Sequence, residues 1–201
     1  IDVFGWESSI RGLRNPMNSW SKSDTIFNVH NANGLVIGEN DLKLMKSLSK
    51  AGSDHAKFLR MINVTMDITA PLYWWKEFDT YKVGTVANSC STMHKIHEKE
   101  FTLDDFSHEH LGPFVNGSLD KDLTLDIKHS DANCSIGLLQ QIIYVLNHFR
   151  KKFIETKDKK YWWQMIQLLP SSYNQKRTVQ LNYQVLKSMH HSRKEHKLDE
   201  W

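Results

Sequence analysis

An alternation of apolar and polar residues from Ile62 to Ile68 constrains the fold more than any other feature of the sequence. Its period of two predicts a half-buried β-strand, whereas the other periodic segments of the chain are helical. Thr69-Ala70-Pro71 follows directly, with Thr69 as the expected cap of a helix and Pro71 suited to its first turn. We therefore expect a strand followed by a helix through Leu72, Trp75 and Phe78.

Four other segments place apolar residues at the spacing of amphipathic helices. The first is expected to begin at Asn40 or Asp41, either of which can cap a helix, and to end at Gly52. The second and third extend from Ile136 to Phe153 and from Tyr161 to Leu169, before Pro170. The fourth extends from about Gln175 to Arg193, which would place Asn182 and Arg193 about three turns apart on one helix.

These patterns together predict an α/β (α+β) fold that is rich in helices around a small central sheet. A length of 201 residues suits a single domain spanning residues 1–201. Gly84 interrupts the helical pattern, and the polar residues Asn88, Ser89 and Ser91 predict a ligand-facing loop. Residues 102–133 show no clear periodicity, and we expect a loop or lid there.

The composition is that of an ordinary soluble protein, with 40% hydrophobic and 24% charged residues. The sequence has no run of about 18 uncharged apolar residues to span a membrane, and its start lacks the pattern of a signal peptide. Cys90 and Cys134 are therefore expected to be reduced thiols of a cytoplasmic protein. Basic pairs in the last quarter favour phosphate-bearing partners, but a net charge of +3 is too small to indicate a nucleic-acid-binding protein.

The segment around the predicted strand resembles part of the flavin-dependent thymidylate synthases. In that family a strand, an Ala-Pro step and a helix precede a signature of the form Arg-His-Arg-x-x-Ser-x-Asn-Glu-x-Ser-x-Arg-Tyr. Here residues 64–73 are similar to the approach, and residues 80–94 occupy the place of the signature. Asn88 and Ser91 keep its Asn-x-x-Ser spacing.

Two further segments continue the resemblance in the same order along the chain. The family has a later helix that follows a Leu-Pro step, carries an Asn-Ala-Arg triplet and ends in Leu-Arg. Here Leu169-Pro170, Asn182-Tyr183-Gln184 and Ser192-Arg193 correspond to these features without a gap from Pro170 onward. Lys50-Ala51-Gly52 with His55 is also similar to the Lys-x-Gly stop and following histidine of the family, so the resemblance covers a little under half of the chain.

The resemblance implies an enzyme that methylates dUMP to dTMP with FAD, NADPH and methylenetetrahydrofolate, assembled as a homotetramer with FAD at the subunit interfaces. It implies that Arg193 is the catalytic, nucleotide-binding arginine. Ser91 would bind the nucleotide phosphate, and Lys82 would keep one positive charge beside it. His55, Arg60, Asn88 and Asn182 would bind the flavin cofactor.

The signature departs from the family at its charged positions. Thr80-Tyr81-Lys82 or Tyr81-Lys82-Val83 stands in place of Arg-His-Arg, and Ser89, Met93 and His94 stand in place of Glu, Arg and Tyr. Arginine binds two phosphate oxygens at once with its planar fork, which a lysine does not. The alternatives are an FAD and pyrimidine-nucleotide enzyme with a different transferred group or substrate, a catalytically inactive binding homologue, and, last, a nucleic-acid binder using the basic C-terminal half.

Histidines and cysteines give no sign of a metal site. The groups His94 to His97, His108 to His110 and His190 to His196 match no standard zinc spacing, and we expect no metal. Cys90 lies within the suspected site, but the resembled family uses no cysteine nucleophile. We expect a small, partly buried thiol there.

Overall fold

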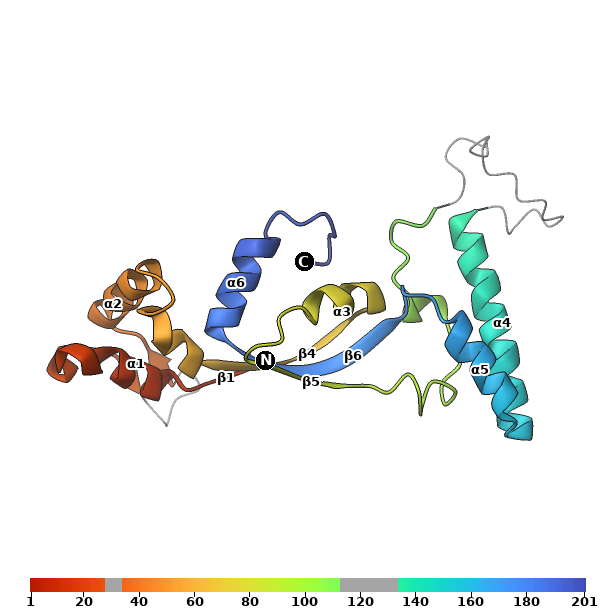
Figure 1. Cartoon of the computed structure of the whole chain (residues 1–201), viewed down its shortest axis with the longest axis horizontal. Helices are drawn as coiled ribbons and strands as arrows, with labels where there is room; N and C mark the ends of the chain where they lie inside the picture. The colour runs from red at the N-terminus through yellow and green to blue at the C-terminus, as the bar shows by residue number, and fades with distance from the viewer. Residues whose placement is uncertain (28–33, 113–133) are drawn as a thin grey trace. The chain divides into compact units, whose positions relative to one another are not determined.

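A computed structural model describes residues 1–27, 34–112 and 134–201 (Figure 1). Within them the elements follow in the order β1 (Asp2–Phe4), α1 (Trp6–Arg14), η1 (Asn15–Met17), η2 (Trp20–Lys22), β2 (Ile26–Phe27), β3 (Leu35–Val36), α2 (Glu39–Lys50), η3 (Ala56–Met61), β4 (Asn63–Pro71), α3 (Leu72–Phe78), β5 (Thr85–Ser89), η4 (Leu103–Asp105), α4 (Ser135–Thr156), α5 (Lys159–Leu168), β6 (Asn174–Asn182) and α6 (Tyr183–Arg193). One sheet has the strand order β1-β4-β6-β5, and β2 pairs with β3. The structure is helix-rich with a small sheet, as predicted.

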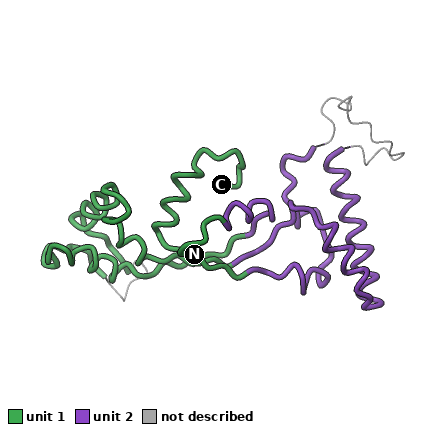
Figure 2. The backbone as a smooth tube through the Cα atoms, viewed as in Figure 1, with its two compact units in different colours: residues 1–68, 80–88, 178–201 green, residues 69–79, 89–177 purple. Residues whose placement is uncertain are grey.

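The described chain forms two compact units (Figure 2). Unit 1 comprises Ile1–Ile68, Thr80–Asn88 and Thr178–Trp201, and unit 2 comprises Thr69–Asp79 and Ser89–Arg177. Each has its own apolar core. The core of unit 1 contains Ile10, Leu13, Met45, Ala56, Phe58 and Ile62. The core of unit 2 contains Ile96, Phe101, Phe106, Leu139, Leu146 and Met165. The expectation of a single domain stays a prediction.

The strand and helix predicted from the period-two segment are confirmed as β4 and α3. Val64, Ala70 and Pro71 are buried in β4, and Trp74, Trp75 and Phe78 are buried in α3. The predicted cap is wrong, because the strand continues through Thr69 and Pro71 is itself the residue before the first helical turn. Pro71 has a φ of −67°, which its ring fixes, and it connects the extended strand directly to the helix.

The predicted first amphipathic helix is confirmed as α2, and Gly52 follows its end with a positive φ of 110°. The prediction that Asn40 or Asp41 caps this helix is wrong. The cap is Gly38, and the Asp24 carboxylate accepts hydrogen bonds from the backbone N–H groups of Asn40 (2.9 Å) and Asp41 (3.1 Å). A carboxylate from outside the helix therefore satisfies two of its unpaired donors.

The Asp41 side chain has a different role. It is fully buried and accepts hydrogen bonds from Nε (2.9 Å) and Nη2 (2.7 Å) of Arg14, which is 5% exposed. Ser23 and Thr25 donate further hydrogen bonds to it through their hydroxyls, each at 2.7 Å. This buried network joins α1, α2 and the segment before β2 within unit 1.

The two predicted helices after the long loop are confirmed as α4 and α5, which pack against each other in unit 2. Leu146 of α4 and Met165 of α5 are fully buried in their shared core. Asp158 caps α5 by accepting a hydrogen bond from the backbone N–H of Lys160. An apolar stripe and a cap thus fix this helical hairpin from local sequence.

The predicted final helix is wrong in its first part. Residues from Asn174 to Asn182 form β6, and α6 begins only at Tyr183. Val179 and Leu181 of β6 are buried while Lys176, Thr178 and Gln180 are exposed, which is the period-two pattern of a strand. Asn182 is consequently the N-cap of α6 and does not lie mid-helix, whereas Arg193 is the last residue of α6, as expected.

The predicted ligand-facing loop around Asn88 and Ser89 is also wrong, because both residues belong to β5. The polar character of β5 is that of an edge strand, whose residues after Thr85 are exposed. The predicted loop at 102–133 begins with the short helix η4, capped by a reciprocal Thr102–Asp105 pair, and Phe106 bridges to Tyr173. Residues 113–133 of this loop lie outside the described residues.

Candidate functional site

The helix α6 places Asn182 and Arg193 at its two ends in unit 1. The Asn182 carboxamide oxygen accepts a hydrogen bond from the Val185 backbone N–H at 3.1 Å and so caps the helix. Its Nδ2 group donates no hydrogen bond to a residue that the structure describes. One side chain can therefore cap α6 through its oxygen and donate to a ligand through its nitrogen.

Residues 81–84 lie against both ends of α6. Tyr81 contacts Arg193 at the C-terminal end of the helix, and Gly84 lies beside Asn182 at the N-terminal end. Gly84 has a φ of +77°, and a Cβ added to it would lie 2.7 Å from Asn182 Nδ2. Glycine is required there for both the backbone conformation and the space. Lys82, which is exposed, lies in the chain between these two contacts.

Arg193 lies within a cluster of aromatic side chains and a histidine. Its Nε donates to the Tyr81 hydroxyl at 3.1 Å, and its guanidinium carbon is 5.6 Å from the Tyr81 ring and 4.6 Å from the Trp201 ring. Its Nη1 is 2.8 Å from His196 Nε2. Because arginine only donates, that histidine nitrogen is the acceptor of this contact. The cluster fixes the direction of the guanidinium, as recognition of a planar anion requires.

The remaining predicted cofactor residues of unit 1 are on its surface. His55 is the N-cap residue of η3, and Arg60 lies in η3 and donates to the Ser53 backbone carbonyl at 3.4 Å. η3 packs against α6, so these residues belong to elements that neighbour the candidate site. Asn88 is exposed on β5.

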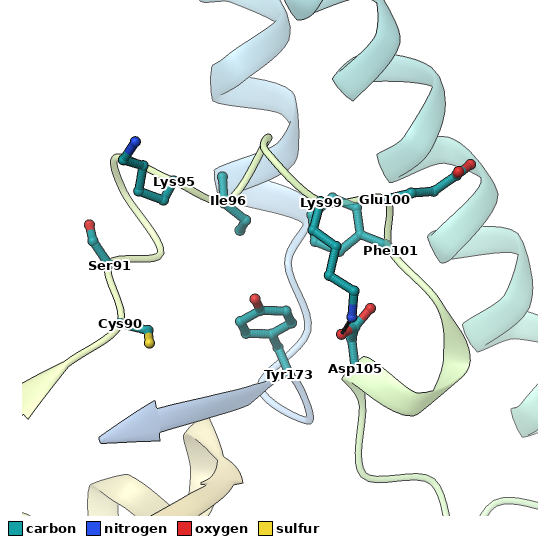
Figure 3. A pocket seen from close by; sticks show the side chains of 9 residues that line it. All are labelled: Cys90, Ser91, Lys95, Ile96, Lys99, Glu100, Phe101, Asp105 and Tyr173. Carbon is teal, nitrogen blue, oxygen red and sulfur yellow. Dashed lines mark hydrogen bonds and ion pairs between the residues drawn. The ribbon is translucent and has the colours of Figure 1, made fainter. Parts of the chain in front are cut away.

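Ser91 lines a pocket of about 240 Å³ in unit 2 (Figure 3). Its hydroxyl accepts a hydrogen bond from the His94 backbone N–H at 3.0 Å. Lys99 lies across the pocket in an ion pair with Asp105 at 2.8 Å, and Lys95 pairs with Glu98. Cys90, Glu100 and Tyr173 also line the pocket, and Cys90 is exposed, which corrects the expectation of a partly buried thiol. The pocket offers hydroxyl and ammonium donors to a small polar or anionic group.

The Tyr173 phenol in this pocket remains protonated over a wide pH range. Burial raises the pKa of Tyr173 above 10.0, and the neighbouring Asp105 carboxylate raises it further, against the opposing effect of Lys99. Sequence reasoning missed Tyr173, Lys99 and Asp105. They meet because Phe106 pairs with Tyr173 across 67 positions of the chain, and no local pattern indicates that pairing.

The residues fit a flavin nucleotide in part. The unused Asn182 amide donor, the oriented Arg193 and the exposed Lys82 are the kinds of groups that bind its carbonyl and phosphate oxygens. Across residues 1–27, 34–112 and 134–201, no cluster of three His, Cys, Asp or Glu is arranged to hold a metal ion. No helix of the described chain has the length and apolar character needed to cross a membrane.

The sequence matches no protein-family model and no curated protein. Two solved structures of the flavin-dependent thymidylate synthase ThyX from Helicobacter pylori with FAD and dUMP are similar to this chain, each with 14% identity and a TM-score of 0.62. Each comparison covers 99% of this chain and 85% of that chain. The UMP/dUMP methylase PolB from Streptomyces cacaoi, bound with 5-Br UMP, is similar with 12% identity and a TM-score of 0.52, over 94% of this chain and 73% of that chain.

At these identities the similarity concerns the fold alone. The expected fold class, a helix-rich α/β architecture like that of the flavin-dependent thymidylate synthases, is confirmed.

Proposed function

We propose that this chain is a flavin-dependent enzyme that methylates a pyrimidine nucleotide, with the conversion of dUMP to dTMP as its reaction. The observation that carries the proposal is the fold similarity over 99% of the chain to an enzyme solved with FAD and dUMP. The placement of Asn182 and Arg193 at the two ends of α6 supports it, because the resemblance assigned these residues to cofactor and nucleotide.

In this proposal Arg193 binds the nucleotide and is the residue on which catalysis depends. Tyr81 and His196 hold its guanidinium by hydrogen bonds at 3.1 Å and 2.8 Å, which orients its donors before the substrate arrives. Lys82 contributes a point charge from the same segment as Tyr81, and Ser91 a hydroxyl for the phosphate. Tyr81 stands where the resembled signature has arginine or histidine, so the chain positions one arginine with a phenol instead of grouping several cations.

Asn182, His55, Arg60 and Asn88 are proposed to bind FAD. When bound, FAD supplies the redox chemistry of the transfer, with NADPH as reductant and methylenetetrahydrofolate as one-carbon donor. The contribution of Asn182 is a hydrogen bond from Nδ2, since its oxygen is engaged by the helix. A homotetramer belongs to the same proposal, and light scattering of the purified protein measures it.

The test begins with the visible spectrum of the purified protein and its titration with FAD. The proposal predicts flavin absorbance or FAD uptake, and release of tritium from [5-³H]dUMP when methylenetetrahydrofolate and NADPH are present. Arg193→Ala is expected to raise the KM for dUMP by about tenfold or more while FAD uptake is kept. Lys194→Ala, which removes the adjacent exposed cation, is the matched control and should leave the KM unchanged.

A protein that stays colourless and takes up no FAD would contradict the proposal. The missing Arg-His-Arg charges favour one other candidate, an FAD and pyrimidine-nucleotide enzyme with a different transferred group or substrate. If its substrate differs, the protein is yellow but releases no tritium from dUMP; if it transfers a different group to C5 of dUMP, it releases tritium without forming dTMP. A catalytically inactive binding homologue would also bind without turnover. Only the enzyme with a different substrate would release tritium from another 5-labelled pyrimidine nucleotide.

A further inference from the structure

A lysine-lined groove lies between α2, η3 and α6 of unit 1, and its lining includes none of the residues assigned above. It has a volume of about 500 Å³ and is lined by Met45, Lys46, Ser49, Lys50, Phe58, Leu59 and Lys187. A second groove, of about 650 Å³, follows α2 and is lined by Glu39, Leu42, Lys43, Lys46, Ser47 and Lys50. Lys46 and Lys50 line both, so the two form one continuous surface, which we call the α2 groove.

The α2 groove has a concentrated positive charge. Lys43, Lys46 and Lys50 are spaced three and four residues apart and therefore share one face of α2. None of the three forms an ion pair with a residue that the structure describes, and Glu39 is the one acidic side chain of the lining. Lys187 reaches the groove from α6, where its ammonium donates to the Ser49 carbonyl and hydroxyl at 2.5 Å and 2.7 Å.

This surface has a local excess of positive charge. Its four lysines and one glutamate carry +3, which equals the net charge of the whole chain. Four of the basic residues that the sequence places in the last quarter form ion pairs, namely Lys152–Glu155, Lys160–Asp158, Arg177–Asp79 and Lys194–Glu195. Like charges on one helical face repel each other, and an anion bound between them removes that repulsion.

The floor of the groove is apolar. Met45 and Phe58 belong to the core of unit 1, with 8% and 4% of their surface exposed, and Leu59 packs beside them. A bare inorganic anion would leave this floor uncovered, whereas an organic anion with a flat ring would cover it. A volume of about 500 Å³ lies within the range of small-molecule sites.

We propose that the α2 groove binds a nucleotide that carries at least two phosphates. The base lies on Met45, Phe58 and Leu59, and the phosphates contact Lys46, Lys50 and Lys187. Lysine ammonium groups bind phosphate as point charges, and neighbouring positions on a helical face are about 5–6 Å apart, which suits two successive phosphates. The ligand is either a free nucleoside diphosphate or the ADP half of a dinucleotide cofactor.

The test is a calorimetric titration of the full chain with ADP, AMP and adenosine at low ionic strength. ADP is expected to bind, AMP more weakly, and adenosine without measurable heat. Lys46→Gln/Lys50→Gln should weaken ADP binding by about tenfold or more, because two charge-assisted contacts are lost. The matched control is Lys151→Gln/Lys159→Gln, which removes the same charge from exposed positions of unit 2 and should leave ADP affinity unchanged.

Repeating the titration with saturating FAD identifies the source of the diphosphate. Competition assigns the groove to the ADP half of the cofactor, and unchanged ADP binding assigns it to a separate nucleotide. Both outcomes support the groove if Lys46→Gln/Lys50→Gln weakens ADP binding by about tenfold or more. Absence of ADP binding to the wild-type chain, or equal losses in the two double variants, overturns the proposal. The test needs neither Arg193 nor turnover of dUMP, so its failure is distinct from failure of the proposed function.

Discussion

Replacing Asp41 with asparagine is expected to lower the free energy of unfolding by about 3–5 kcal/mol, because it leaves the Arg14 guanidinium buried without a counter-charge. Asp41 is fully buried and Arg14 is 5% exposed, so water cannot replace the lost partner. Asparagine keeps the size and one acceptor oxygen of aspartate, which isolates the effect of charge from that of a cavity.

The pKa of Asp41 gives an independent value for the stability that its negative charge contributes. Burial alone would raise this pKa, but hydrogen bonds from Thr25, Ser23 and Arg14 outweigh burial and lower it from 3.8 to about 2. Such a difference corresponds to about 2.5 kcal/mol of stability at neutral pH. Because the folded-state pKa lies below the unfolded one, this stability is complete above about pH 4 and is lost as the pH falls toward 2.

The assay is urea unfolding followed by tryptophan fluorescence, at pH 7 and at points from pH 4 down to pH 2. The difference between wild type and Asp41→Asn should be largest at pH 7 and shrink below pH 4. Glu7→Gln, which breaks the exposed Glu7–Arg11 pair at 3.9 Å, is the control and should cost about 0.5 kcal/mol or less. Ser23→Ala removes a single hydrogen bond and should cost about 1 kcal/mol, which keeps the reasoning testable if Asp41→Asn does not fold. A loss below about 1 kcal/mol for Asp41→Asn at pH 7 would refute the buried-charge reasoning.

Three more variants test other parts of the structure. Gly84→Ala should cost about 1–2 kcal/mol, because its φ is +77° and the new Cβ would lie 2.7 Å from Asn182; Gly112→Ala, at an open position, should melt like wild type. Leu146→Ala should cost about 2–5 kcal/mol in urea unfolding, since Leu146 is fully buried between α4 and α5, and a cost under about 1 kcal/mol would mean that this core is loosely packed. Asn182→Ala should lose about 1 kcal/mol of stability with the α6 cap, whereas Asn182→Asp should keep the melting temperature but weaken FAD uptake; unchanged uptake in both would exclude Asn182 from the flavin site.

Elements with a strong local pattern were predictable from the sequence. The apolar stripes of α2, α4 and α5 and the alternation in β4 depend on neighbours within one or two turns or pleats, so their type follows without knowledge of the rest of the chain. The ends of these elements were less predictable. Asp41 is of a residue type that often caps helices, but its side chain binds Arg14, which lies 27 positions earlier. The Asp24 carboxylate accepts the hydrogen bond from the Asp41 backbone N–H instead.

Two of the strands that the sequence did not predict, β5 and β6, depend on pairing that no local pattern fixes. In β6, Val179 and Leu181 alternate with polar residues, yet the same segment also fits a helical stripe through Val179, Tyr183 and Leu186. Pairing in the sheet decides between the two, because backbone groups of a strand must find partners from distant residues. The backbone N–H of Cys90, for example, bonds the carbonyl of Lys176 across 86 positions.

For the candidate site, the sequence by itself determined which residues and in what order: the step from β4 into α3, then Asn88 and Ser91, then Asn182 and Arg193. Only the tertiary structure decided what those side chains contact, with Arg193 beside Tyr81 and Trp201, Asn182 against Gly84, and Ser91 in a pocket with Tyr173. It also decided which cations are paired, since Lys152 and Arg177 form ion pairs, whereas Lys43, Lys46 and Lys50 of α2 form none with a residue that the structure describes. The physical reason is that helix and strand type depend on neighbours along the chain, whereas burial, ion pairing and ligand geometry depend on residues that only the fold brings together.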